Sequence, residues 1–267
     1  MKHLTPTLFK PIQPSVDYAN HNKVIYREIV PHTDLRAYIH CYWELKTTQP
    51  LEHPFTYRVV SDGCIDILIE QNQVRQLFIT GFSTKYLEYN LGQDFHYIGI
   101  RFLPLGFPAF FDISANKLTN QFLPLQEVEE ELHMKLYDVF RQPQTLESAQ
   151  LLLDQVFLSI QPKSEIDPRI LHPVNQMLEA KGHLKLKDLD LTISERQLRR
   201  LFDFYYGESP KTFNMILRFQ NILNAKPSVS SLKENKIFYE QGYYDQAHFI
   251  KEFKTFYGVT PSVAFGR

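Results

Sequence analysis

The stretch Gln241–Phe256, QGYYDQAHFIKEFKTF, decides the fold of the C-terminal part of this chain. Its apolar residues recur at i, i+2, i+3, i+6 and i+9, which predicts a helix that buries one face. Those residues are Ala247, Phe249, Ile250, Phe253 and Phe256. Asp245 stands at the N-cap position and so marks where the helix begins. The remaining face carries Gln246, His248, Lys251, Glu252 and Lys254. Amide and cationic groups presented in this way suit base edges and phosphates in the major groove of DNA.

A second helix of the same kind is predicted to begin at Ser194. It places Arg196, Arg199 and Arg200 at i, i+3 and i+4, which is one face of a helix. The opposite, core-facing side carries Leu198, Leu201 and Phe202. Arginine is the side chain that most often makes base-specific contacts, because its guanidinium pairs bidentately with guanine. The alternative is a solvated arginine surface with no partner.

These two segments carry a family resemblance. Gly242–Ser262, GYYDQAHFIKEFKTFYGVTPS, resembles the C-terminal signature of AraC/XylS-type transcription regulators, and Ser194–Leu223 resembles the first half of the same DNA-binding unit. The resemblance implies that seven residues face the major groove, namely Arg196, Arg199, Arg200, Gln246, Ala247, His248 and Lys251. Within the second helix it favours Gln246 for a base edge, His248 for a base or a phosphate, and Lys251 for a phosphate. Ala247 offers only a methyl contact to thymine.

The periodicity from Asp167 onward is helical and predicts an all-α domain of seven helices with two helix-turn-helix motifs. The helices are expected near 168–181, 185–190, 194–205, 209–224, 233–241, 245–256 and 260–264. The helix Pro210–Ala225, about 22 Å long, would hold the two reading helices roughly one turn of DNA, 34 Å, apart. Two features depart from the family pattern: the lead into the first reading helix is short, and Phe238 stands where a small residue is usual.

The N-terminal half is rich in short β-favouring runs separated by turn residues, which favours an antiparallel sandwich or barrel. The runs are Tyr38–Leu45, Thr56–Val60, Ile65–Glu70, Gln76–Ile79 and His96–Phe102. The phrases SDGCIDILIE, FITGF and IGIRFLPLGFPAFF, between about residues 55 and 125, resemble a module that precedes AraC-type DNA-binding domains. That resemblance implies a cupin-like β-barrel with helices behind it.

Two amphipathic helices are predicted after the strands, at Leu125–Val139 and Thr145–Ile160. They are expected to pack on the barrel, and a dimer seam is the alternative. The prediction is therefore an α+β chain in three parts. Residues 1–160 form a domain for effector sensing or dimerisation, with an N-terminal arm over 1–22. A linker at 161–168 joins it to the DNA-binding domain at 169–267.

The strand His96–Phe102, HYIGIRF, raises the question of a ligand site. Ile98, Ile100 and Phe102 alternate with Tyr97, Gly99 and Arg101, so the two sets point to opposite sides of a sheet. If Arg101 faces the interior, it would bind an anionic ligand. The outward orientation, at the surface or as a buttress of the fold, is the favoured interpretation.

Metal binding is not expected, nor any other cofactor. The N-terminal half has histidines at positions 32, 40, 53 and 96, but it lacks the compact His-x-His followed by Glu of a metal cupin. The two cysteines, Cys41 and Cys64, are too few for a disulfide framework and are expected to be reduced and buried.

Charge is distributed unevenly along the chain. The net charge of all 267 residues is −1, but residues 1–163 carry 14 Lys/Arg against 18 Asp/Glu, and residues 164–267 carry 15 against 12. The cationic excess thus coincides with the predicted DNA-binding half. The sequence begins without an apolar run of signal-peptide length and contains none of membrane-spanning length, so a soluble cytoplasmic protein without membrane contact is expected.

Taken together, these features predict a sequence-specific transcription regulator rather than an enzyme. Its expected partners are double-stranded promoter DNA, a small-molecule effector, a second copy of the chain in a homodimer, and RNA polymerase if it is an activator. Two rival hypotheses stay open: a cupin-type metalloenzyme with an appended helical domain, and a constitutive DNA-binding protein whose barrel serves only protein–protein contact. No Ser/His/Asp constellation, phosphate-binding glycine loop or catalytic carboxylate pair supports other chemistry.

Overall fold

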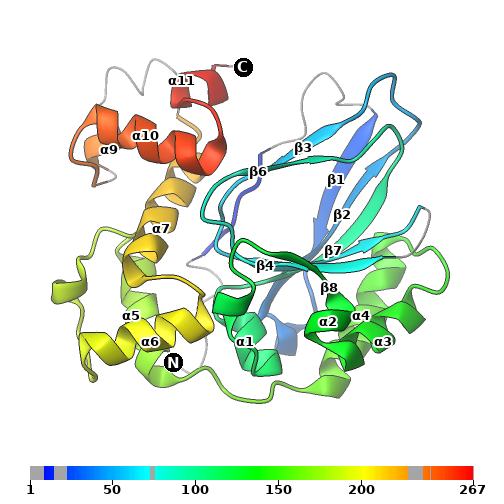
Figure 1. Cartoon of the computed structure of the whole chain (residues 1–267), viewed down its shortest axis with the longest axis horizontal. Helices are drawn as coiled ribbons and strands as arrows, with labels where there is room; N and C mark the ends of the chain where they lie inside the picture. The colour runs from blue at the N-terminus through cyan, green and yellow to red at the C-terminus, as the bar shows by residue number, and fades with distance from the viewer. Residues whose placement is uncertain (1–8, 15–22, 73–75, 228–236, 241, 267) are drawn as a thin grey trace.

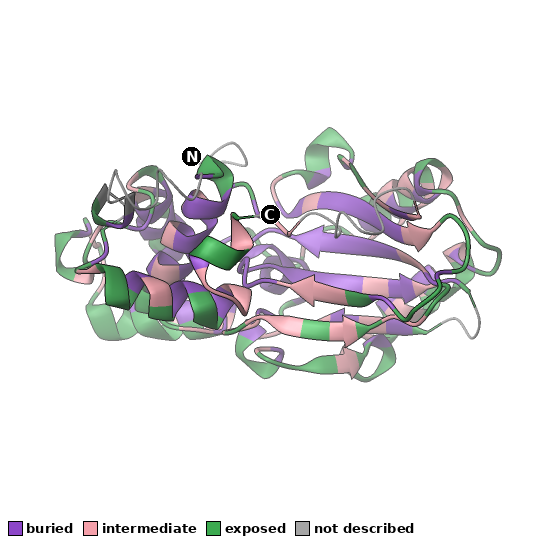
Figure 2. Ribbon diagram, turned by 90° about the horizontal axis from the view of Figure 1, so that it is seen from above, coloured by how far each residue is buried: buried purple, intermediate pink, exposed green. Residues whose placement is uncertain are grey.

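The structure is a computed structural model of the chain, and it describes residues 9–14, 23–72, 76–227, 237–240 and 242–266. Its N-terminal part consists of antiparallel strands backed by helices, and its C-terminal part is helical (Figure 1). Figure 2 shows that buried residues concentrate in the strands and on the inner sides of the helices. The predicted α+β class is confirmed.

Within the described residues, eight strands form two sheets. The strands are β1 (Val24–Ile29), β2 (Ile39–Thr47), β3 (Thr56–Val59), β4 (Ile65–Glu70), β5 (Leu77–Thr80), β6 (Leu87–Asn90), β7 (His96–Phe102) and β8 (Phe122–Pro124). Six of them form one sheet in the order β1-β2-β7-β4-β5-β8, and β3 pairs with β6 alone. Every strand pair is antiparallel. All five predicted strands are present within a residue or two of their expected limits.

The prediction of a closed barrel is wrong for the part of the chain that the structure describes. Among the described residues, β1 and β8 have no further strand partner at the edges of the six-stranded sheet. The β3–β6 pair lies over one face of that sheet rather than closing it. The arrangement is an open sandwich. β6 and β8 escaped prediction because LEYN and FLP are short and half-exposed, so they lack the apolar alternation of a half-buried strand.

The two faces of the six-stranded sheet have different covers. Ile98, Ile100 and Phe102 of β7 are fully buried beneath helices. The Phe102 ring centroid lies 5.3 Å from that of Phe107 and 5.8 Å from that of Phe157. The covering helices are α1 (Gly106–Phe111), α2 (Leu125–Val128), α3 (Glu130–Val139) and α4 (Leu146–Ile160), with short 3-10 turns η2 (Thr33–Leu35) and η3 (Ala115–Lys117) nearby. The predicted helices at 125–139 and 145–160 thus pack on the sheet, the former divided at Glu129.

The C-terminal part contains the expected succession of helices. They are α5 (Pro168–Glu179), η4 (Leu186–Asp188), α6 (Glu195–Tyr205), α7 (Pro210–Ala225), α9 (Ile237–Glu240), α10 (Gln246–Tyr257) and α11 (Pro261–Ala264). The short lead before the first reading helix appears as η4, a single 3-10 turn. The predicted helix at 233–241 falls partly outside the described residues, and within them Phe238 is buried with its ring stacked 6.2 Å from that of Phe249.

The predicted linker and part of the predicted arm are packed against the rest of the chain. In the linker, Ile166 is buried, and the backbone amide of Ser164 donates to the carbonyl oxygen of Ala109 in α1 at 3.2 Å. Of the arm at 1–22, residues 1–8 and 15–22 lie outside the described residues. Phe9 is buried, and the side chain of Gln13 donates to the carbonyl oxygen of Val60 at 3.0 Å. The linker and the described part of the arm are therefore held against the β-rich N-terminal part.

Candidate functional site

The helix α6 is anchored by its cap and its apolar face. The hydroxyl of Ser194 accepts from the backbone amide of Gln197 at 3.3 Å, and the Gln197 side chain accepts from the amide of Ser194 at 3.1 Å. This reciprocal capping fixes the start of the helix. Leu198 and Phe202 are fully buried, which turns the opposite face outward.

The three predicted arginines of α6 all lie on that exposed side. The Nη2 atom of Arg199 is 2.8 Å from a carboxylate oxygen of Glu195, one helical turn earlier. Arg196 and Arg200 form no ion pair with any described residue, so their guanidinium groups are free to meet another polyanion. A surface pair such as Arg199–Glu195 is weak and opens readily.

The helix α10 presents its polar residues in the same way. The Asp245 side chain accepts from the backbone amide of His248 at 2.7 Å, which confirms the predicted N-cap. Gln246, His248 and Lys251 are exposed. Ala247 is also exposed, so the prediction that it belongs to the buried stripe is wrong. A residue that faces the major groove must be exposed, and Ala247 meets that condition.

Glu252 was expected on the exposed face of α10 but is buried. Its carboxylate lies 3.7 Å from Nη2 of Arg218 on α7 and 3.7 Å from Nε2 of His248. Burial raises the pKa of Glu252, and the neighbouring Arg218 acts against that rise. Glu252 lies beside the buried apolar residues of α10, at a position that α7 covers. Its burial therefore depends on how α7 and α10 pack together.

The helix α7 holds α6 and α10 in a fixed relation. Near its N-terminus, the Phe213 ring is 5.8 Å from that of Phe202 in α6. Further along, the Phe219 ring is 5.5 Å from that of Phe253 in α10. Figure 1 shows α6 and α10 at opposite ends of α7. With 16 residues, α7 is about 24 Å long, slightly more than the roughly 22 Å expected.

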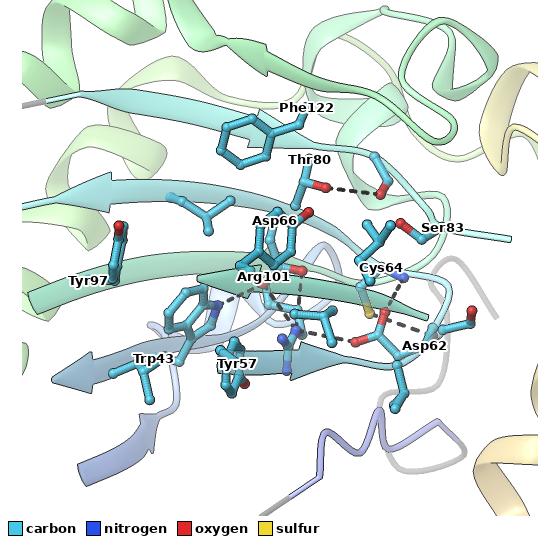
Figure 3. Close-up of a pocket in the computed structure, with 18 of the residues that line it drawn as sticks. Trp43, Tyr57, Asp62, Cys64, Asp66, Thr80, Ser83, Tyr97, Arg101 and Phe122 are labelled. Atoms are coloured by element: carbon cyan, nitrogen blue, oxygen red, sulfur yellow. Dashed lines mark hydrogen bonds and ion pairs between the residues drawn. The ribbon is translucent and has the colours of Figure 1, made fainter. Parts of the chain in front are cut away.

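A second feature lies in the N-terminal part, where a cavity of about 200 Å³ opens between the six-stranded sheet and the β3–β6 pair. Five aromatic rings line it, those of Trp43, Tyr57, Tyr89, Tyr97 and Phe122. The charged groups among its described lining residues are Asp62, Asp66 and Arg101 (Figure 3).

The favoured outward orientation of Arg101 is wrong. Its side chain is 5 % exposed and faces the cavity, because the apolar set of β7 lies beneath the helices. Its Nε atom donates to both carboxylate oxygens of Asp66, at 3.1 and 3.3 Å. Carboxylate oxygens of Asp62 and Glu28 also lie 3.7 Å from its guanidinium. Arg101 is thus already surrounded by carboxylates, which weakens the case for it as an anion-binding residue.

Asp66 has an unusual environment. It accepts from Nε1 of Trp43 at 2.7 Å as well as from Arg101. Burial nevertheless raises the pKa of Asp66 to about 6, since the positive charge of Arg101 only partly compensates for lost hydration. Sequence reasoning missed Asp62, Asp66 and Trp43. The alternation of side chains along β2 and β4 is a sequence signal for Trp43 and Asp66, whereas Asp62 lies in the loop before β4 and has no such signal.

A possible metal-ligand group among the described residues is Glu28, His40 and Cys41, whose ligand atoms lie within 4.8 Å of one another. Two features oppose a metal ion there. The Arg101 guanidinium, 3.7 Å from Glu28, already supplies a positive charge. Burial also raises the pKa of the Cys41 thiol, which disfavours the thiolate that a metal would need.

The segment Val60–Cys64, between β3 and β4, touches both the cavity and the helical part. Val60, Ser61, Asp62 and Cys64 line the cavity. On the other side, the carbonyl oxygen of Ser61 accepts from the side chain of Gln220 on α7 at 2.9 Å. The Ser61 amide also donates to the carbonyl oxygen of Phe256 on α10 at 3.4 Å.

The end of α6 meets the same region. The Tyr206 ring stacks on that of Phe82 at 4.9 Å. A Cβ atom at Gly63, whose φ is +78°, would lie 3.0 Å from the Tyr206 hydroxyl oxygen. The Val60–Cys64 segment is therefore in contact with α7, α10 and the residue that ends α6.

Comparison with known proteins found one family match in each part of the chain. Residues 190–267 match a helix-turn-helix domain family (HTH_18), and residues 27–124 match a domain of unknown function (DUF6597). Searches among curated proteins and among solved structures found no significant match.

The C-terminal match covers α6, α7 and α10 and defines an AraC-type helix-turn-helix domain, which implies DNA-binding transcription regulation. It indicates a regulator rather than an enzyme. The N-terminal match covers the β-rich part and carries no assigned role. Among the described residues, no helix has both the length and the apolar character needed to cross a membrane.

Proposed function

We propose that this chain is a sequence-specific transcription regulator that reads two successive major-groove segments of promoter DNA through α6 and α10. The observation that carries the proposal is that both helices expose cationic and amide side chains while α7 fixes their relation. A rigid pair of reading helices on one chain suits two groove segments on one side of a duplex.

Each exposed residue has a role in this proposal. Arg196 and Arg200 contact base edges or phosphates, and Arg199 joins them once its pair with Glu195 opens. On α10, Gln246 contacts a base edge, and His248 a base or a phosphate. Lys251 contacts a phosphate, and Ala247 offers only a methyl contact to thymine.

Regulation by a small-molecule effector is the second part of the proposal. The cavity supplies the site, and the Val60–Cys64 segment supplies the connection, because it borders the cavity and contacts α7 and α10. An effector can act only through unequal affinity for two states of the chain. It follows that effector and promoter DNA must change each other's affinity by the same factor.

A second copy of the chain is a further proposed partner. Large apolar side chains are exposed on α3 and α4, where a second copy of the chain would cover them: Met134, Tyr137, Leu151 and Leu158. If the regulator is an activator, RNA polymerase is a further partner.

The test is selection of DNA from a random pool by the full-length protein, followed by footprinting of the enriched sequence. We expect two protected segments about one helical turn apart on one side of the duplex. Arg200→Ala should weaken protection and base preference in one segment, and Gln246→Ala should do so in the other. Absence of any enriched sequence, or a single segment weakened by both variants, would contradict the two-helix proposal.

A further inference from the structure

We infer that the cavity between the six-stranded sheet and the β3–β6 pair binds a small organic cation, an amine carried on an apolar or aromatic body. The inference deepens the proposed function and rests on it, because it names the chemical class of the effector. It stands on three features of the cavity: its charge, its aromatic walls and one unpartnered hydroxyl.

The charge of the cavity favours a cation. Two carboxylates, Asp62 and Asp66, and one guanidinium, Arg101, line its described surface. A third carboxylate, Glu28, lies on the far side of that guanidinium at 3.7 Å. Glu28 is exposed to solvent, so within the cavity itself one positive charge faces two negative charges. Uncompensated charge is costly in such a poorly hydrated place. A second cation would reduce that imbalance, whereas an anion would compete with carboxylates that already hold Arg101.

The aromatic walls suit an organic cation better than a bare ion. Figure 3 shows Trp43, Tyr57 and Tyr97 around the Asp66–Arg101 pair, with Phe122 across the cavity. Aromatic faces attract ammonium groups and also bury apolar surface. Gly99 makes this arrangement possible, since a Cβ atom at that position would overlap the Trp43 indole.

The unpartnered hydroxyl belongs to Ser61. Ser61 is 1 % exposed and lines the cavity, and its Oγ atom has no hydrogen-bond partner among the described residues. A buried polar group without a partner is costly, so an occupant that donates a hydrogen bond to Ser61 Oγ would be stabilised there. An ammonium group can donate to this oxygen and to the nearby carboxylates at the same time.

The same residue ties the occupant to the helices that bind DNA. The Ser61 backbone pairs with Gln220 of α7 and with Phe256 of α10. A ligand that engages the Ser61 side chain therefore acts on a residue whose main chain already contacts both helices.

The experiment uses the full-length protein and three probes of similar size that differ in charge: phenethylamine, 2-phenylethanol and 3-phenylpropionate. We expect phenethylamine at millimolar concentration to raise the melting temperature, because a ligand that binds only the folded state stabilises it. The alcohol should have a smaller effect and the carboxylate none. Equal or greater stabilisation by the alcohol or the carboxylate, or no stabilisation by phenethylamine, would overturn the inference.

The decisive variant is Ser61→Ala. It removes an unpartnered hydroxyl, so the protein without ligand should be as stable as the wild type, while its affinity for phenethylamine, measured by calorimetry, should fall about tenfold. Ser159→Ala, on α4 and outside the cavity, is the matched control and should leave the affinity unchanged. Asp66→Asn should weaken the amine further. An amine affinity unchanged in both Ser61→Ala and Asp66→Asn would place binding elsewhere and overturn the site.

DNA binding is measured on the same preparations without ligand. If the protein binds DNA but fails the amine assays, only the cation site is refuted. If it binds the amine but not DNA, the proposed function is refuted.

Discussion

Gln246 and Lys251 are both exposed on α10, but their chemistry suits different parts of DNA. The Gln246 amide can pair bidentately with adenine, whereas the Lys251 ammonium is a point charge suited to a phosphate.

At the residue scale we predict that Gln246→Ala weakens binding to the selected sequence by about 1–3 kcal/mol and relaxes preference at one base pair. Binding to random DNA should change little, because non-specific affinity comes from phosphate contacts. Titration of the selected and of random duplexes at fixed salt measures both. Lys251→Ala is the matched control: it should weaken both duplexes alike and reduce the salt slope by about one. Equal losses on both duplexes for Gln246→Ala would remove Gln246 from base recognition.

A second residue-scale prediction concerns pH. Burial raises the folded-state pKa of Asp66 from 3.8 to about 6, opposed chiefly by Arg101. An acid with a raised folded pKa contributes stability that is complete below about pH 4 and is lost as pH rises through about 6. The folded and unfolded pKa values of Asp66 differ by about two, and each pKa unit corresponds to about 1.36 kcal/mol, so the stability lost is at most about 3 kcal/mol.

Urea unfolding between pH 4 and 7.5 measures this contribution. The free energy of unfolding of Asp66→Asn, relative to that of the wild type, should rise over this interval. A constant difference between the two proteins would show that Asp66 titrates normally. For the same reason, amine binding should weaken as pH falls through about 6, since protonated Asp66 carries no charge.

At the scale of elements, α7 does more than separate α6 from α10. Gln220, in its C-terminal half, is buried and connects three parts of the chain. Its side-chain oxygen accepts from the Ile12 amide at 2.7 Å, and its nitrogen donates to the carbonyl oxygen of Ser61 at 2.9 Å. One side chain on α7 thus joins the N-terminal segment and the cavity wall to the DNA-binding domain.

We predict that Gln220→Ala lowers the free energy of unfolding by about 1–3 kcal/mol, because it leaves buried backbone groups without partners. Hydrogen exchange at Ser61 and its neighbours should quicken, while non-specific DNA binding should persist since α6 and α10 are untouched. Asn224→Ala, exposed on the same helix, is the control and should have little effect. Unchanged exchange around Ser61 would show that Gln220 does not hold the two parts together.

At the scale of the whole molecule, the DNA-binding domain contacts the N-terminal part over several elements. Tyr206 stacks on Phe82, and the Tyr86 amide donates to the carbonyl oxygen of Thr255 at 3.1 Å. The side chain of Asn116 donates to Asp203 of α6 at 2.7 Å. A change in the N-terminal part can therefore reach both α6 and α10 through direct contacts.

We predict that residues 164–267 alone bind DNA, because α6, α7 and α10 all lie there. Affinity should fall steeply with salt as phosphate contacts release counterions. The fragment should be less stable than the full chain, since separation exposes Tyr206 and other buried apolar residues. Circular dichroism confirms folding, and retention of genomic fragments at low salt measures binding. A folded fragment that retains no DNA would refute the assignment of DNA binding to this half.

Local sequence determined where α6 and α10 begin. Ser194 and Asp245 cap α6 and α10 as predicted, because capping and apolar periodicity depend on residues a few positions apart. The alternation along β7 likewise separates Arg101 from Ile100 without reference to any other strand. The exposure of the arginines of α6 and of Gln246 and Lys251 on α10 also followed from periodicity.

Tertiary structure alone decided which face of β7 turns toward helices and which toward a cavity. A period of two distinguishes two faces but does not say what covers either one, and here both faces are covered. The burial of Glu252 likewise depends on Arg218 from another helix. The Asp62–Asp66–Arg101 cluster joins residues from two strands and a loop, whose proximity follows from strand order. Strand order is set by non-local pairing, which no local pattern in the sequence encodes.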